Sequence, residues 1–264
     1  TELSLAGLQN KLLLVATERG WGRPVGGQPS THILKIDDQR FPGLVSAEAA
    51  ALRLARGLGL GDLDPQLHQI EGVDCLIVAR YDRLRAADGT IGRVHQEDSC
   101  QALGVMPDAH RGRGKYESSG GPTFAQIASL LRRYSADPGD ELDRLVRMIA
   151  FTMIIGNADG HGKNLSLLYP APGMPTLAPL YDTVPTVLWP RLRTTAAMSV
   201  AGETEFIRIG LDAITREAEG WGMPGERARS LAVDVVERAL RAASGLGHDQ
   251  VGELVTGRAT QMLG

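Results

Sequence analysis

Apolar residues follow two different periodicities along the chain. In the first third, short apolar runs typical of strands cover residues 12–15, 31–36 and 73–78, and the glycine- and proline-rich stretch between the first two indicates an antiparallel pair. Farther along the chain, apolar residues recur mostly at helical spacing. The pattern therefore predicts an α+β fold with two lobes, a small β-rich lobe over residues 1–83 and a larger helical lobe over residues 84–264.

Capping residues indicate where the helices begin. Ser46 is expected to cap a helix that runs to Gly57, Thr123 to cap a second, and Asp140 to open a third that leads to Met153. The apolar stripes of these helices are interpreted as core rather than as cofactor contacts. Further helices are expected at residues 96–103, 211–219, 225–243 and 248–262.

A polar loop, GNADGHGKNLS, lies between two apolar runs at residues 156–166. Within it Asn164 follows Asp159 by five positions, which is the spacing of the protein-kinase catalytic loop. There the aspartate accepts the proton of the attacking hydroxyl, and the asparagine oxygen binds Mg²⁺. A second magnesium ligand is expected from a strand soon after, and Asp182 is the candidate. Alone, the spacing fits equally well a surface turn in which both side chains only form capping hydrogen bonds.

Lysine is rare in this chain, since only four of its 28 lysines and arginines are lysines. Lys35 alternates with two apolar neighbours on its strand, and a lysine at such a position holds ATP phosphates in kinases. The alternative is a solvent-facing edge lysine. Gly7 and Lys11 precede the first strand and are candidates to lie over phosphates, although an ordinary turn is the plainer interpretation. Glu48 either pairs with Lys35 or only complements the dipole of its helix.

The apolar run at 73–78 leads into the sequence ARYDR, residues 79–83. In a two-lobed kinase this place is the hinge, whose backbone binds adenine and whose next polar residue reaches the ribose. Asp82 is the candidate for the ribose contact, and a salt bridge with Arg80 or Arg83 is the alternative. Residues 107–122 are rich in glycine and contain Lys115. Such loops often contact substrate, but we expect a flexible connector here.

Composition narrows the class of protein. Two cysteines form no disulfide framework and fit a reducing cytosol, so a cytoplasmic protein is expected. The apolar runs are too short for a membrane span. A net charge of −3 gives no global attraction to nucleic acid, so direct nucleic-acid binding is not expected.

Seven motifs stand out along the chain: SLAGLQNK (4–11), THILK (31–35), VARYDR (78–83), HQEDSCQALG (95–104), KYESSGGP (115–122), IGNADGHGKNLSLL (155–168) and LYD (180–182). As a set, they resemble the HipA-type serine/threonine kinases, the toxins of bacterial toxin–antitoxin pairs. They occur in the family order over roughly residues 4–205.

The resemblance implies a protein-kinase-like fold and ATP- and Mg²⁺-dependent phosphorylation. Asp159 would be the catalytic base, Asn164 and Asp182 would bind magnesium, and His161 would contact the γ-phosphate or the substrate. Self-phosphorylation at Ser4 would inactivate the enzyme. The residues expected to contact the nucleotide are Gly7, Lys11, Lys35, Arg80, Tyr81, Asp82, His161, Lys163 and Asp182.

The resemblance also implies partners. The substrate would be a protein such as an aminoacyl-tRNA synthetase, and the antitoxin a HipB-like helix-turn-helix protein. Two features depart from the family pattern: Ala79 stands where glutamate is usual, and the family's N-terminal subdomain is absent. We expect either a trimmed chain or a short form whose missing subdomain is a separate protein.

Two alternatives stay open. The loop Asp-x-His-x-x-Asn also occurs in small-molecule kinases of the aminoglycoside or choline type, although the motifs at 4–11 and 115–122 do not belong to that group. In the other alternative, the chain is a co-repressor that binds a DNA-binding antitoxin and has little catalytic activity. The presence of Lys35, Asp159, Asn164 and Asp182 argues against an inactive kinase.

Overall fold

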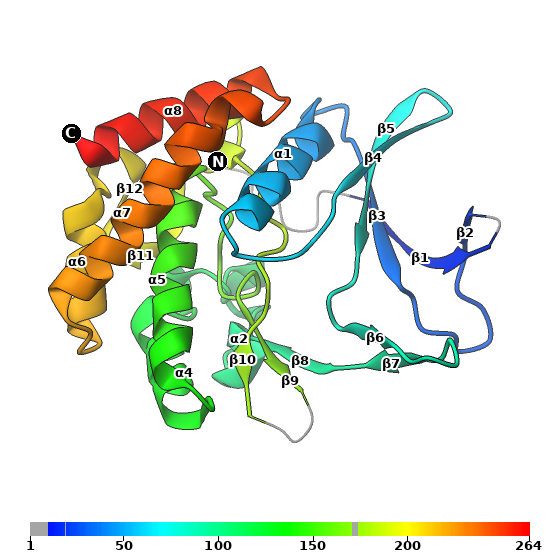
Figure 1. Cartoon of the computed structure of the whole chain (residues 1–264), viewed down its shortest axis with the longest axis horizontal. Coiled ribbons are helices and arrows are strands. Elements are labelled where there is room, and N and C mark those ends of the chain that lie inside the picture. The colour runs from blue at the N-terminus through cyan, green and yellow to red at the C-terminus, as the bar shows by residue number, and fades with distance from the viewer. Residues whose placement is uncertain (1–9, 19, 171–173) are drawn as a thin grey trace.

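A computed structural model describes residues 10–18, 20–170 and 174–264. Its first part is an antiparallel sheet with the strand order β2-β1-β3-β5-β4 (Figure 1). The expected pairing of the first two apolar runs is confirmed, because Leu12 lies opposite Leu34. The strands are β1 (Lys11–Thr17), β2 (Gly20–Gly22), β3 (His32–Ile36), β4 (Gln66–Ile70) and β5 (Val73–Ala79).

Register brings two of the lysines together. Lys11 of β1 lies directly opposite Lys35 of β3. Since side chains alternate along a strand, Lys35 shares its face of the sheet with Ile33. On β5 the partners of these two β3 residues are Leu76 and Val78. This face of the sheet therefore carries both lysines beside the apolar residues Ile33, Leu76 and Val78.

Helix α1 (Leu44–Gly57) lies between the sheet and the other helices (Figure 1). One side of it packs Val45, Ala49 and Leu52 against the sheet face that carries Leu76 and Val78. Its other side joins the large core of the helical part. Small alanines on α1 allow this close approach on both sides.

The expected N-cap of α1 at Ser46 is wrong. The helix begins three residues earlier than expected, at Leu44, after Gly43 with φ of 80°. Ser46 instead donates its hydroxyl to the Gly43 carbonyl oxygen at 2.9 Å. The shift moves Glu48 out of the first turn, which contains no acidic residue.

The helical part is built around α5, which contacts each of the four other long helices of that part. Thr123 caps the helix that begins at Phe124, as expected, because its Oγ1 accepts the Gln126 N–H. The start of α5 was predicted three residues late: its N-cap is Asp137, whose side chain accepts the Asp140 N–H. These helices are α4 (Phe124–Tyr134), α5 (Pro138–Ile154), α6 (Leu211–Gly220), α7 (Gly225–Ala242) and α8 (Asp249–Leu263).

Two predictions for the middle of the chain are wrong. The helix expected at 96–103 is divided into strand β8 (His95–Asp98) and helix α2 (Ser99–Ala102), because Asp98 accepts the Gln101 N–H and begins a capping box there. The connector at 107–122 contains a short turn, α3 (Ala109–Gly112), in which His110 and Arg111 have positive φ, and a 3₁₀ turn at Glu117–Ser119. The second turn packs on the rest of the protein, as described below.

The remaining strands form small sheets. Strands β8, β9 (Ser166–Tyr169) and β10 (Thr176–Leu177) form one sheet, and β9 leads out of the polar loop. The two remaining pairs are β6 (Arg83–Arg85) with β7 (Ile91–Arg93), and β11 (Thr195–Val200) with β12 (Glu203–Glu205). Within the described residues, no helix is both long enough and apolar enough to cross a membrane.

Candidate functional site

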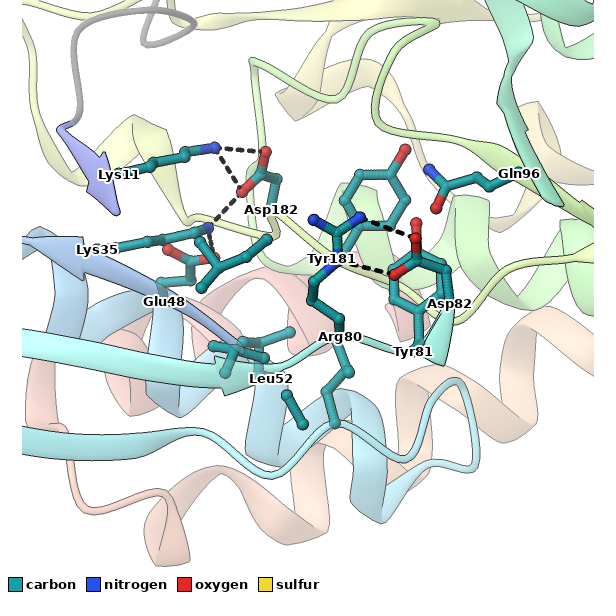
Figure 2. A pocket seen from close by; sticks show the side chains of 14 residues that line it. Lys11, Lys35, Glu48, Leu52, Arg80, Tyr81, Asp82, Gln96, Tyr181 and Asp182 are labelled. Atoms are coloured by element: carbon teal, nitrogen blue, oxygen red, sulfur yellow. Dashed lines mark hydrogen bonds and ion pairs between the residues drawn. The ribbon is translucent and has the colours of Figure 1, made fainter. Parts of the chain in front are cut away.

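Four charged side chains from distant parts of the chain meet at the sheet face that carries the two lysines (Figure 2). Lys35 Nζ forms ion pairs with the carboxylates of Glu48, on α1, and Asp182. Lys11 Nζ lies 2.9 Å from Asp182 Oδ2. Lys35 and Glu48 are 5% and 0% exposed, so Lys35 is not a solvent-facing edge lysine and the pairing of Glu48 with it is observed.

Burial and pairing set the protonation of this cluster. Burial alone would lower the pKa of Lys35, but the carboxylates of Asp182 and Glu48 outweigh it and hold that pKa above its ordinary value. Burial would likewise raise the pKa of Asp182, yet Lys35 and Lys11 hold it well below the usual range. For Glu48 burial dominates and raises the pKa, with Lys35 opposing. Its Oε2 has no hydrogen-bond partner within the described chain.

A pocket opens beside the cluster (Figure 2). It contains six of the nine residues predicted to contact a nucleotide: Lys11, Lys35, Arg80, Tyr81, Asp82 and Asp182. Sequence reasoning missed Ile33 and Val78, although strand alternation with Lys35 gives the signal for Ile33. It had no signal for Gln96, Leu52 or Leu63, because their place depends on how β8, α1 and the loop after α1 pack.

Asp82 lies at the pocket and also forms the salt bridges that were its alternative interpretation. Its Oδ2 is 2.8 Å from Arg80 and 2.5 Å from Arg83. Burial would raise the pKa of Asp82, but the two guanidinium groups lower it. Asp82 is therefore an ionised carboxylate whose position is fixed by its neighbours.

The polar loop follows α5, and hydrogen bonds hold its backbone at several points. Gly156 has φ of 63° and ends the helix, and the Ala158 N–H donates to Thr186 Oγ1 at 2.7 Å. Asn164 Nδ2 donates to the Asp159 carbonyl oxygen at 2.8 Å. Since the amide nitrogen is used in this way, Oδ1 is the Asn164 atom that can meet a cation.

His161 lies beside Asp159 and is 2% exposed. Its Nε2 is 4.0 Å from Asp159 Oδ2, and neither ring nitrogen has a hydrogen-bond partner in the described part of the chain. Burial, helped by the nearby Lys115 cation, lowers the pKa of His161 to about 3. The imidazole is therefore neutral near pH 7, with two buried polar atoms that a ligand would satisfy.

The loop and the pocket meet at Tyr181 and Asp182. Tyr181 donates its hydroxyl to the Lys163 carbonyl oxygen at 2.6 Å, and its ring lines the pocket. Asp182 lies not on the expected strand but in a bend, with φ of 48°. That conformation is unusual for a residue other than glycine and is often found at functional sites.

Some predicted residues are not brought to the pocket. Asp159, His161 and Asn164 belong to the adjoining loop, and the Lys163 ammonium pairs with Asp98 at 3.0 Å. The predicted contacts of Gly7 and Ser4 lie outside the described residues.

The predicted metal ligands Asn164 and Asp182 provide an amide oxygen and a carboxylate, which suit Mg²⁺. Within the described chain, no three His, Cys, Asp or Glu side chains gather in a way that would hold a metal ion by themselves. A hard cation here would therefore draw further oxygens from water or from a bound phosphate.

Comparison with known proteins identifies a family profile and several relatives that match this chain. The profile described as HipA-like C-terminal domain matches residues 3–243. Y4mE of Sinorhizobium fredii, named as a candidate kinase, is 41% identical over 97% of this chain. The serine/threonine-protein kinase toxin HipA of Shewanella oneidensis is 30% identical over 90% of it. The chain spans 63% and 55% of the lengths of these two relatives.

Solved structures confirm the fold class. A chain in the Shewanella oneidensis complex of HipA, HipB and operator DNA matches with a TM-score of 0.84 and 26% identity, over 99% of this chain and 64% of that one. The Helicobacter pylori proinflammatory kinase CtkA matches with a TM-score of 0.50 and 12% identity, over 96% and 98% of the two chains. The second likeness concerns the fold alone. The predicted α+β, two-lobed kinase-like fold is confirmed.

Proposed function

This chain belongs to the HipA-like C-terminal domain family, and on that premise we propose that it is a protein kinase that transfers the γ-phosphoryl group of ATP to a serine or threonine hydroxyl. The observation that carries the proposal is the pairing of the buried Lys35 with Glu48 and Asp182 at the edge of a pocket. In protein kinases a strand lysine held by a helix glutamate is a required part of the active site.

The pocket supplies the groups that a nucleotide triphosphate needs. Lys11 and Lys35 present ammonium groups at one end, while Ile33, Leu52 and Val78 offer apolar contacts for a base. Glu48 holds Lys35 in place, so little side-chain entropy is lost when phosphate binds. Phosphate oxygens would take over the lysine contacts that Asp182 makes in the free protein.

Asp182 and the Oδ1 atom of Asn164 are the residues that would hold Mg²⁺. When bound, this ion neutralises negative charge on the phosphates. Asp159 accepts the proton of the acceptor hydroxyl, and such a general base contributes typically ~10²–10⁴-fold to a rate. His161 would donate a ring N–H to the transferred group, which would satisfy a buried nitrogen that has no hydrogen-bond partner among the described residues.

Finer parts of the proposal concern substrate and regulation. The substrate would be a protein such as an aminoacyl-tRNA synthetase, and the partner a HipB-like helix-turn-helix antitoxin. A phosphate on Ser4, about −1.5 to −2 charges, would repel the ATP phosphates and inactivate the enzyme. A Ser4-phosphorylated chain that binds ATP as tightly as the unmodified chain would contradict this regulation.

Calorimetric titration with Mg·ATP tests the site itself. We expect the wild type to bind and the double variant Lys35→Met/Glu48→Gln to bind at least ~10-fold more weakly, because one charge-assisted contact is lost. The double variant removes both charges, so it leaves no buried Glu48 carboxylate without its lysine. Arg227→Met, which breaks only an exposed ion pair with Asp143, is the control. Equal affinity of the double variant and the wild type would place the nucleotide elsewhere.

A further inference from the structure

Asp159 has a close neighbour to which sequence reasoning gave no role. Tyr116, which is 5% exposed, donates its hydroxyl to Asp159 Oδ1 at 2.5 Å. A hydroxyl bonded to a carboxylate forms a short, charge-assisted hydrogen bond. The bond links the segment Lys115–Pro122, expected to be a flexible connector, to the residue proposed as the base.

This segment is fastened to the protein on both sides of Tyr116. The Gly162 N–H of the polar loop donates to the Lys115 carbonyl oxygen at 3.1 Å. On the other side, the Glu117 carboxylate accepts the Ser199 N–H at 2.6 Å and the Ser199 hydroxyl at 2.7 Å. The Tyr116 backbone is therefore held between the polar loop and strand β11.

Glycines allow close packing within the segment and between the segment and the loop. A Cβ added to Gly162 would lie 2.5 Å from Pro122 Cγ, and one added to Gly121 would lie 2.7 Å from the Tyr116 carbonyl carbon. Neither place has room for a side chain, so these glycines serve close contact rather than flexibility.

The Tyr116 ring is held as well. It meets the His161 ring edge-on, with centroids 5.2 Å apart and an interplanar angle of 83°. The Arg193 guanidinium lies 5.3 Å from the Tyr116 ring centroid, and the Lys115 ammonium lies 5.4 Å from it. Cations at this distance from an aromatic ring are attracted to it. Because these contacts hold both the backbone and the ring of Tyr116, they also fix the position of its hydroxyl.

We propose that Tyr116 is the positioning residue for Asp159. Its hydroxyl holds Oδ1, and this fixes the plane of the carboxylate so that Oδ2, beside His161, is the oxygen that meets the acceptor hydroxyl. The inference rests on the proposed kinase function. It assigns Tyr116 no contact with the nucleotide, so its loss lowers the rate of transfer without weakening ATP binding.

The test measures phosphate transfer from Mg·ATP, as phosphate incorporated into the chain and phosphate released to water, over a range of ATP concentrations. Tyr116→Phe removes the hydroxyl and keeps the ring. We expect its maximal rate to fall roughly 10–100-fold, as for one hydrogen bond to a charged group, with an unchanged ATP concentration at half-saturation. Tyr169→Phe is the matched control, because the Tyr169 hydroxyl also donates to a carboxylate, that of Glu97, at 2.6 Å. Its maximal rate should stay within about twofold of wild type.

A second variant covers the case in which Tyr116→Phe does not fold. Glu117→Gln weakens the contact with Ser199 and keeps the tyrosine hydroxyl, so the maximal rate should fall by roughly 2–10-fold, again at unchanged half-saturation. A Tyr116→Phe rate within about twofold of wild type, or above it, would overturn the inference while wild type is active and Asp159→Asn is not. A wild type without any transfer would overturn the proposed function itself, and this inference with it.

Discussion

The two ends of the candidate site are built in opposite ways. At the pocket, Lys11, Lys35, Glu48 and Asp182 are charged groups that pair with one another. In the adjoining loop, a neutral His161 has two buried nitrogens without a partner within the described chain, and hydrogen bonds hold Asp159 and Asn164.

The difference indicates that the charged residues of the pocket contribute mainly to stability and the loop residues mainly to rate. Buried charges that neutralise one another hold the pocket in shape before a ligand arrives, and removing one leaves its partner uncompensated. In the loop, hydrogen bonds hold Asp159 and Asn164, so conservative changes of these two side chains should have little effect on folding. Substitutions at the pocket should therefore lower stability, and substitutions in the loop should lower rate.

The largest effect is expected for Lys35→Met. It leaves the carboxylate of Glu48 buried without a counter-charge, which should lower the free energy of unfolding by about 3–5 kcal/mol. Urea unfolding measures this change. Adding Glu48→Gln to the same chain should recover most of the loss, and a double variant no more stable than Lys35→Met would show that the two charges do not depend on each other.

Asp159→Asn tests the other end of the candidate site, the polar loop. Asn keeps an oxygen that can accept the Tyr116 hydroxyl, so stability should change little, but it cannot take a proton. The rate of phosphate transfer should fall at least ~100-fold. Asp143→Asn, which changes only a surface ion pair, serves as the control. A loss smaller than ~10-fold would leave Asp159 a positioning residue at most.

His161 should show itself in the dependence of stability on pH. Its pKa is about 3 in the folded chain and 6.5 in the unfolded one, so below 6.5 the unfolded chain binds a proton that the folded chain does not. The stability contributed by the neutral ring is complete above 6.5 and is lost as the pH falls toward 3. Between about pH 6 and pH 4, the wild type should lose up to ~1.4 kcal/mol per pH unit more than His161→Phe. Parallel curves for the two proteins would contradict a buried neutral histidine.

The smallest effect is expected for Lys11→Met, which removes the other cation from Asp182. Its side chain is 42% exposed, against 6% for that of Lys35. An exposed ion pair of this kind contributes at most ~1 kcal/mol, and added salt should reduce even that. If Lys11→Met were as destabilising as Lys35→Met, the distinction between exposed and buried charges in this cluster would be wrong.

Sequence reasoning reached the cations and the loop but not their connections. Alternation along β3 gave the face of Lys35, and spacing gave Asp159 and Asn164. The pairing of Glu48 was harder to see, because helix α1 begins at Leu44 instead of after Ser46, and this start depends on the left-handed Gly43. Local capping signals do not show such a turn.

The prediction of a flexible connector at Lys115–Pro122 was wrong for a different reason. Its glycines favoured flexibility when considered alone, yet Gly121 makes room for the backbone of Tyr116, and the distant Gly162 makes room for Pro122. The contact of Gly162 with Pro122 joins residues that are far apart in the sequence, as the Tyr116–Asp159 hydrogen bond does. No local pattern predicts a partner at such a distance.

The most direct test of the central claim is intact mass, with peptide mapping, after incubation with Mg·ATP. Wild type and Asp159→Asn are compared under the same conditions, with free phosphate measured alongside. The proposed kinase should transfer phosphate in the wild type only, with a gain of one phosphate that maps to Ser4. Equal transfer by both proteins would contradict the role of Asp159, and no transfer to protein or to water by the wild type would contradict the kinase itself.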